Sequence, residues 1–499
     1  MTRVGASAVT GGTVVTPGGL READVLISDG QIASIAEPGS ATEPGPGAEH
    51  IDAGGCYVLP GGVDPHCHLM AQVGLATAAA ARGGTTTALS FTNPEPGQGD
   101  LDSLLGRREE LGRGDAVVDV GLHAMLYDPE HVRLDDLIAA RRAGAAAVKV
   151  FLAYPELGIM CSTRGLYRLM SAARRAGLLV QVHCENGPLI EELVAGAVRS
   201  GQRGEPVFAS TRPPEVEEEA VARTLTVASL AGAPCYLVHL STAGAIEQVR
   251  LARRRGQPPV FAEVCLHHLL LDDERYTGQD AGRFLVAPPL RAASHVEALW
   301  AAVADGTIDA VGSDHCQTRS AVLDDIAAPG ESYSYGIAGI GARLPLLLSE
   351  GLRRGLPVER LVQLAAETPA RVFGHYPRKG ALAPGSDADV VVFDPAGEAV
   401  LAGDAFDDGT GASVYTGRRV RGRLRAVLLR GRLIAAEGRL VGGPGHGGYL
   451  AATEAHGPPA WRRALRSRTC EQLPRSDSCP GDVNADPDLP DLCRPGQAG

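Results

Sequence analysis

The strongest constraint on the fold is an alternation that runs through the middle of the chain. Between Gly62 and Arg371, short apolar or β-branched runs alternate with longer amphipathic segments rich in Ala, Leu and Arg. This alternation is typical of repeated strand and helix units around a parallel sheet. Eight runs are predicted as strands, at residues 61–66, 86–91, 117–123, 146–151, 178–183, 235–240, 259–264 and 308–314. Eight such units predict a TIM (β/α)8 barrel, with its functional residues at the carboxyl ends of the strands.

Both ends of the chain predict β-structure outside this barrel. Residues 1–60 and 375–445 contain short strand-like runs separated by Gly and Asp turns. Neither flank alone offers enough strands for a stable core. We therefore expect them to pair into one small β-sandwich domain beside a barrel of residues 61–374. Residues 446–499 show no sustained periodicity, which predicts a C-terminal arm and a flexible tail.

Composition narrows the class of protein. Apolar residues make up 44 % of the chain, and 47 basic against 59 acidic residues leave a net charge of −12, which disfavours a nucleic-acid or anionic-membrane partner. No window is apolar over the roughly 18 residues of a membrane helix, and the N-terminus lacks the apolar core of a signal peptide. The cysteines are scattered without a CxxC pair, as expected for reduced thiols. These features predict a cytoplasmic enzyme.

Lysine usage singles out one position. Only Lys149 and Lys379 are lysines among the 47 basic residues. Lys149 lies in AGAAAVKVFLAY, a run that otherwise predicts a fully buried strand. Unlike a guanidinium, a lysine amine can be neutralised and covalently modified. Lys149 is then a paired core lysine, a Schiff-base nucleophile or a carbamate, formed with CO2, that binds metal.

Metal-competent side chains gather at the predicted strand ends. In DPHCH, His66 and His68 stand two residues apart, so a strand places both on the same side. The whole group comes from five separate strands: His66, His68, Lys149, His183, His239 and Asp314. Their convergence on one barrel mouth predicts a site for two divalent metal ions.

This neighbourhood favours the carbamate among the three roles of Lys149. A protonated amine would be repelled by two cations, whereas the two oxygens of a carbamate could bridge them. A metal pair that generates hydroxide and polarises a carbonyl indicates a hydrolase. Asp314 would bind metal, accept the proton of the attacking water and return it to the leaving nitrogen. Tyr154 could donate its phenol to the oxyanion, with a packing role as the alternative.

Many segments of the chain resemble the dihydropyrimidinases and hydantoinases, cyclic-amide hydrolases of the amidohydrolase superfamily. They run in order from about residue 55 to 395 and include LPGGVDPHCHL, VKVFLAY, VHCENG, TRPPEVEEEA, YLVHLST, APPLR and GSDHC. The resemblance implies that a five- or six-membered cyclic ureide or imide is opened to an N-carbamoyl amino acid. It also implies zinc as the metal and a homotetramer or homodimer.

The resemblance also implies a role for each candidate. His66 and His68 would bind the more buried metal, and Asp314 would complete that site and act as the base. His183 and His239 would hold the second metal, and Lys149, as a carbamate, would bridge the two. Tyr154 matches the oxyanion tyrosine of the family.

The sequence departs from the family around the predicted substrate pocket. Only LMAQVGLATAAAAR separates His68 from Gly83, which predicts a shortened lid. Ala287 and Tyr335 stand where the family has a serine and an asparagine that grip the ring amide. We therefore expect an unusual ring substituent on the small-molecule substrate. Allantoinase and dihydroorotase remain alternatives, the latter weakened by Met70 where dihydroorotases carry an arginine. A non-catalytic scaffold of the same fold is disfavoured by the full ligand set.

Overall fold

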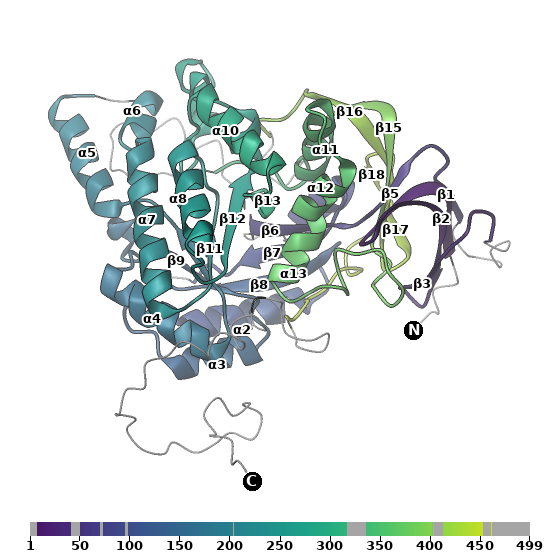
Figure 1. The fold of residues 1–499 in the computed structure, drawn as a ribbon, viewed down its shortest axis with the longest axis horizontal. Coiled ribbons are helices and arrows are strands. Elements are labelled where there is room, and N and C mark those ends of the chain that lie inside the picture. The colour runs from purple at the N-terminus through teal and green to yellow at the C-terminus, as the bar shows by residue number, and fades with distance from the viewer. Residues whose placement is uncertain are drawn as a thin grey trace, which may run out of the picture.

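A closed ring of parallel strands forms the centre of this computed structural model (Figure 1). The structure describes residues 7–40, 50–69, 73–94, 98–202, 204–316, 336–401, 403, 413–452 and 461, so that Tyr335 and nearly all of the predicted tail lie outside the described residues. The strands are β6 (Gly62–His68), β7 (Thr85–Phe91), β8 (Asp119–Met125), β9 (Val148–Phe151), β10 (Val180–His183), β11 (Cys235–Leu237), β12 (Val260–Cys265), β13 (Ala310–Gly312) and β14 (His315–Cys316).

The eighth strand of the ring is split, and its two halves close the barrel. β13 pairs in parallel with β12, and β14 pairs in parallel with β6, the first strand. Ser313 and Asp314 occupy the break between the halves. All eight predicted strands are present with shifts of a few residues at their ends, so the predicted TIM barrel is confirmed.

Helices cover the outside of the ring because each has one apolar face to bury. In α4, for example, Leu166, Leu169 and Met170 are buried, Ser162 accepts a hydrogen bond from the N–H of Gly165, and Gly177 ends the helix with φ of 70°. The helices are α1 (Val73–Arg82), α2 (Asp100–Leu111), α3 (Leu134–Arg142), α4 (Thr163–Ala176), α5 (Gly187–Arg199), α6 (Glu205–Ser210), α7 (Pro214–Ala231), α8 (Ala243–Arg254), α9 (Leu266–Leu270), α10 (Ala293–Ala304), α11 (Arg343–Arg353), α12 (Val358–Val362) and α13 (Thr368–Val372). Within the described ranges, none could span a membrane.

The two ends of the chain build a second sheet beside the barrel, on the right of Figure 1. Its strands are β1 (Ser7–Thr16), β2 (Gly19–Ser28), β3 (Gln31–Ala36), β4 (His50–Asp52), β5 (Tyr57–Pro60), β15 (Val390–Val400), β16 (Arg419–Leu429), β17 (Arg432–Ala436) and β18 (Arg439–Leu440). The N-terminal and C-terminal parts join where β5 pairs antiparallel with β15. The predicted pairing of both ends into one β-rich unit is therefore confirmed, while the domain limits stay predictions.

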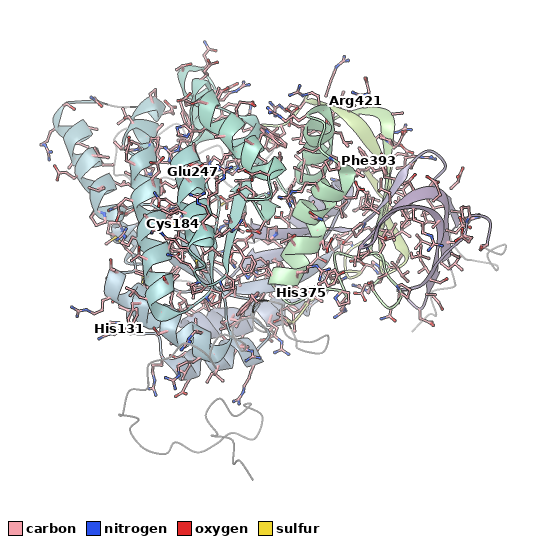
Figure 2. The ribbon with its side chains drawn as sticks, viewed as in Figure 1. His131, Cys184, Glu247, His375, Phe393 and Arg421 are labelled. Atoms are coloured by element: carbon pink, nitrogen blue, oxygen red, sulfur yellow. The ribbon has the colours of Figure 1, made fainter. Side chains whose placement is uncertain are left out.

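The terminal sheet packs against the barrel through a shared apolar core. Phe393 of β15, labelled in Figure 2, is 1 % exposed and belongs to the same buried cluster as Leu344 and Leu347 of α11. The chain then returns to the barrel, where Tyr449 bridges to Val120 of β8. Trp461 is buried among residues of several barrel strands and donates from its indole nitrogen to the carbonyl of Val372 at 2.9 Å.

A buried ion cluster joins the two parts. Lys379, 1 % exposed, lies 2.7 Å from Asp119 of β8 and 2.8 Å from Asp389, which precedes β15. Asp387 lies 3.0 Å from the same ammonium, and Arg430 also donates to Asp119. Burial alone would lower the pKa of Lys379, but the three carboxylates outweigh it and raise the pKa. The ammonium is therefore charged and fully paired.

Replacement of Lys379 by Met should reduce the free energy of unfolding by about 3–5 kcal/mol, because three carboxylates would lose their central cation. The matched control is Arg378→Met, which removes an ion pair to Asp387 from a side chain that is 40 % exposed and should have an effect below about 1 kcal/mol. Urea unfolding followed by circular dichroism measures both. Equal effects of the two substitutions would contradict a central role for Lys379.

Candidate metal centre

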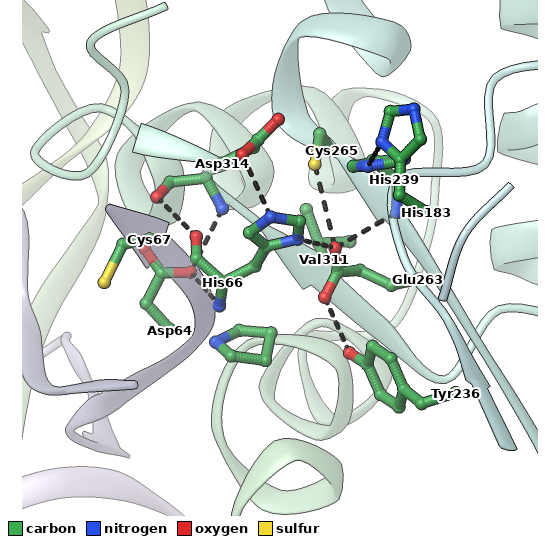
Figure 3. Close-up of polar contacts among 12 residues, drawn as sticks. Asp64, His66, Cys67, His183, Tyr236, His239, Glu263, Cys265, Val311 and Asp314 are labelled. Atoms are coloured by element: carbon green, nitrogen blue, oxygen red, sulfur yellow. Dashed lines mark hydrogen bonds and ion pairs between the residues drawn. The ribbon is translucent and has the colours of Figure 1, made fainter. Parts of the chain in front are cut away.

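The carboxyl end of the barrel brings the predicted ligands together, and Figure 3 labels His66, His183, His239 and Asp314 among them. His66 and His68 come from β6, Lys149 from β9 and His183 from the end of β10. His239 follows β11 by two residues, and Asp314 lies in the break of the eighth strand. The barrel thus collects, around one mouth, residues that span most of its sequence.

One group of ligands forms around Asp314. Its Oδ1 lies 3.0 Å from Nε2 of His66 and 3.5 Å from Nε2 of His68. All three residues offer a ligand atom within 4.8 Å of one another. Two imidazoles and a carboxylate in this arrangement can hold one divalent cation.

A second group lies directly beside the first. Nδ1 of His183 and Nε2 of His239 are 2.9 Å apart. The ring centroids of His239 and His66 are 5.4 Å apart, so the two groups adjoin. The pair of facing nitrogens offers two of the ligands that a second cation needs.

Lys149 stands buried at the centre without a carboxylate partner. It is 1 % exposed, and Nζ lies 4.9 Å and 5.3 Å from the ring centroids of Phe91 and Phe151. Burial lowers its pKa to about 8, although the charges of Asp314 and Glu263 act in the opposite direction. Within the described part of the chain, no carboxylate lies within ion-pair distance of Nζ, in contrast to Lys379. This disfavours the paired core lysine.

The electrostatics of the mouth favour a cation. Burial would lower the pKa of His66, but the carboxylates of Asp314 and Glu263 raise it to about 9. Positive charge is therefore stabilised between those two carboxylates. Burial is the main cause that lowers the pKa of His68, His183 and His239. These three imidazoles are neutral at pH 7 and keep a nitrogen lone pair for a metal.

Backbone strain is concentrated at the same place. Among the described residues, six non-glycine residues have a positive φ, and three of them are predicted site residues. Their φ angles are 66° at Tyr154, 39° at His239 and 44° at Asp314. Such conformations are unfavourable for residues with a side chain and occur mainly where surrounding structure enforces them at functional sites.

The predicted substrate contacts are partly brought together. The ring centroid of Tyr154 lies 5.0 Å from that of His183, next to the second group of ligands. Ala287 is 7 % exposed and belongs to a buried apolar cluster against which Tyr154 also packs. Tyr335 lies outside the described residues, so its predicted contact stays a prediction.

Comparisons with known proteins agree with this geometry. The model of the Amidohydrolase family matches residues 57–434. D-hydantoinase from Geobacillus stearothermophilus is 35 % identical over 457 residues, with 89 % of this chain and 95 % of the relative covered. D-phenylhydantoinase from Escherichia coli O9:H4 is 36 % identical over 459 residues, with 89 % and 97 % covered.

Solved structures give the same result. A dihydropyrimidinase from Brevibacillus agri superposes with a TM-score of 0.83 at 34 % identity and covers 89 % of this chain and 98 % of its own. An L-hydantoinase from Arthrobacter aurescens gives a TM-score of 0.82 at 28 % identity, with 89 % and 99 % covered. The chain belongs to the amidohydrolase family, in its hydantoinase and dihydropyrimidinase group. Membership of this amidohydrolase family implies divalent metal ions, which the donor set described above fits.

Two buried glutamates that the sequence analysis missed support the histidines of this amidohydrolase. Glu263 of β12 is 0 % exposed, and its Oε1 lies 2.6 Å from Nδ1 of His66. Its other oxygen accepts a hydrogen bond from the Tyr236 hydroxyl at 2.7 Å. Glu185, also 0 % exposed, lies 2.9 Å from Nε2 of His183. A carboxylate on one ring nitrogen orients the other toward a metal and makes it more basic.

The sequence contained a signal for both glutamates. Glu263 interrupts the apolar run PVFAEV, and Glu185 follows His183 by two residues. Neither signal identifies a partner, because the contact of Glu263 with His66 joins residues that are 197 positions apart. Burial within a strand was the available clue, since an unpaired buried carboxylate is strongly unfavourable.

Replacement of Glu263 by Gln should weaken metal binding at the His66 group about 10- to 100-fold, because the amide keeps the size but removes the charge that polarises the imidazole. The metal that each chain retains is measured by elemental analysis while the chelator concentration is increased. The variant should lose one ion per chain before it loses the second. Glu247→Gln is the control, since Glu247 lies on α8 with a side chain 59 % exposed (Figure 2). Unchanged retention in Glu263→Gln would contradict the positioning role.

Proposed function

We propose that this amidohydrolase hydrolyses the ring amide of a cyclic ureide or imide, of the hydantoin or dihydropyrimidine type, to an N-carbamoyl amino acid. The observation that carries the proposal is the convergence of four histidines, one aspartate and an unpaired buried lysine at one barrel mouth. A scaffold without catalysis would have no need of this set. The relatives named above are hydantoinases and a dihydropyrimidinase, which supports the same substrate class.

The ligand assignment follows the two groups of side chains. His66, His68 and Asp314 would hold the more buried ion, and His183 and His239 the second. Imidazole and carboxylate donors suit zinc. When bound, the two metal ions supply a hydroxide at neutral pH and polarise the scissile carbonyl.

Lys149 would complete the pair as a carbamate. The neutral amine attacks CO2, a new N–C bond forms, and one amine proton leaves to solvent. The product carries one negative charge on two oxygens, which are ligands for hard cations. Burial against Phe91 and Phe151, without a carboxylate partner, favours the loss of the ammonium charge that this reaction requires.

Two residues would act in proton transfer and in stabilising the negative charge that develops on the carbonyl oxygen. Asp314, whose side chain is 12 % exposed at the mouth, would accept the proton of the attacking water and return it to the departing ring nitrogen. Tyr154, beside His183, would donate its hydroxyl to the oxyanion that forms on the carbonyl oxygen. Ala287 and Tyr335 would contact the ring amide through their backbone atoms.

Two further features belong to this proposal. We place the enzyme in the cytoplasm, where thiols are reduced, because the six buried cysteines of the described residues form no disulfide. We also propose a homotetramer or homodimer, because α5 exposes Leu189, Leu193 and Val198 to solvent in the single chain. A solution mass equal to the 51.8 kDa of one chain would contradict the oligomer.

The proposed function is tested by ring opening with the zinc- and bicarbonate-supplied enzyme. The panel contains dihydrouracil, hydantoin, 5-substituted hydantoins, allantoin and dihydroorotate, and ureido or carbamoyl products are measured by chromatography. We expect the highest kcat/KM with a hydantoin or dihydropyrimidine ring. Highest turnover of allantoin or dihydroorotate would instead support those rival activities, and no turnover by enzyme with two bound metals would contradict the proposed substrate class.

The carbamate is tested by replacing Lys149 with Ala and adding small molecules that fill the vacated space. Acetate supplies two oxygens, so it should restore metal retention and part of the ring-opening rate. Ethylammonium restores only an amine and serves as the control. Rescue by ethylammonium rather than acetate would show that the amine itself acts, and Lys149→Arg should stay inactive because its guanidinium cannot form the carbamate.

A further inference from the structure

A second set of metal-competent side chains lies beside the proposed pair and shares only Asp314 with it. Cys265 ends β12, and His267 lies two residues further on, in the short helix α9. The Cys265 sulfur, a ring nitrogen of His267 and a carboxylate oxygen of Asp314 all lie within 4.8 Å of one another. Cys265 and His267 are both 0 % exposed. The three residues form a thiol, imidazole and carboxylate cluster at the inner wall of the mouth.

His267 is unusual because neither of its ring nitrogens has a hydrogen-bond partner among the described residues. A buried polar group without a partner is destabilising by about 1–3 kcal/mol and requires an explanation in the native structure. The ring of His268 packs against the ring of His267 with centroids 4.3 Å apart, which fixes its orientation without satisfying a nitrogen.

We propose that Cys265, His267 and Asp314 form a third cation site, selective for thiophilic divalent ions such as Cd2+ or excess Zn2+. A thiolate, an imidazole and a carboxylate are the donors that such ions take, with a fourth position left for water. Binding replaces the S–H bond of Cys265 with a sulfur–metal bond and releases one proton to solvent. The cation in turn gives His267 the partner that the protein does not provide.

This third site would inhibit the enzyme. Asp314 belongs to both the cluster and the proposed catalytic pair, and a cation on its carboxylate would compete for the oxygen that accepts the proton. Cys265 and His267 belong only to the third site. Inhibition by excess metal should therefore depend on these two residues, which goes beyond the proposed ring-opening function. The binding measurement below does not require that function to be correct.

The test starts from enzyme loaded with two zinc ions per chain and adds Cd2+ stepwise. We expect one further ion per chain, no release of zinc, an ultraviolet thiolate-to-cadmium charge-transfer band and the release of one proton. Cys265→Ser and His267→Gln should bind the third ion at least about tenfold more weakly, since each loses a ligand. Cys235→Ser is the matched control, because Cys235 is equally buried at the start of β11 and away from the mouth.

The outcomes separate the alternatives. Zinc release with a total of two ions would mean that Cd2+ exchanges into the catalytic pair, and it would overturn the proposal. A band that persists in Cys265→Ser would assign it to another cysteine and would overturn the proposal as well. Should a variant fail to fold by circular dichroism, the wild-type stoichiometry still decides, because binding of only two ions excludes a third site. With an active substrate identified, Cd2+ inhibition should weaken at least about tenfold in Cys265→Ser.

Discussion

The buried ammonium of Lys379 is the interaction on which the relation of barrel and terminal sheet depends. It is surrounded by carboxylates from a barrel strand and from the segment that leads into β15, so both parts must be in register before any charge is paired. A charge that is deeply buried tolerates only small displacements of its partners. Lys149 is equally buried but has no carboxylate within ion-pair distance among the described residues. The two lysines therefore differ in role, because Lys379 is a paired structural charge and Lys149 is a group available for chemistry.

The break in the eighth strand gives the site its geometry. A continuous strand would place successive side chains alternately inside and outside the barrel. The left-handed backbone at Asp314 interrupts this alternation and holds the carboxylate between His66 and His68. His239 is placed by a similar local conformation just after β11. Strain at both positions is held by the many hydrogen bonds of the closed barrel, which the short strands alone could not provide.

Local patterns were sufficient to predict the barrel and the meeting of the candidate ligands at one mouth, because apolar periodicity and strand ends are both visible along the chain. Contacts between strands that are distant in the sequence were harder to predict. The partner of His66, Glu263, lies 197 residues away, and nothing near either residue specifies the other. The same limit applies to Cys265 and His267, whose local sequence indicates only an ordinary strand and helix. The sequence predicted that strands from the two ends of the chain would pair, but not the register of β5 with β15. That register depends on packing between both ends of the chain.

The placement of both lysines in the interior leaves the folded surface without a single lysine amine, since the remaining 45 of the 47 basic residues are arginines. Reagents that acylate or crosslink primary amines would find no lysine amine on the outside of the folded chain. Reaction of an internal lysine with such reagents would report that the barrel or its junction with the sheet has opened, so amine labelling provides a direct measure of unfolding for this protein.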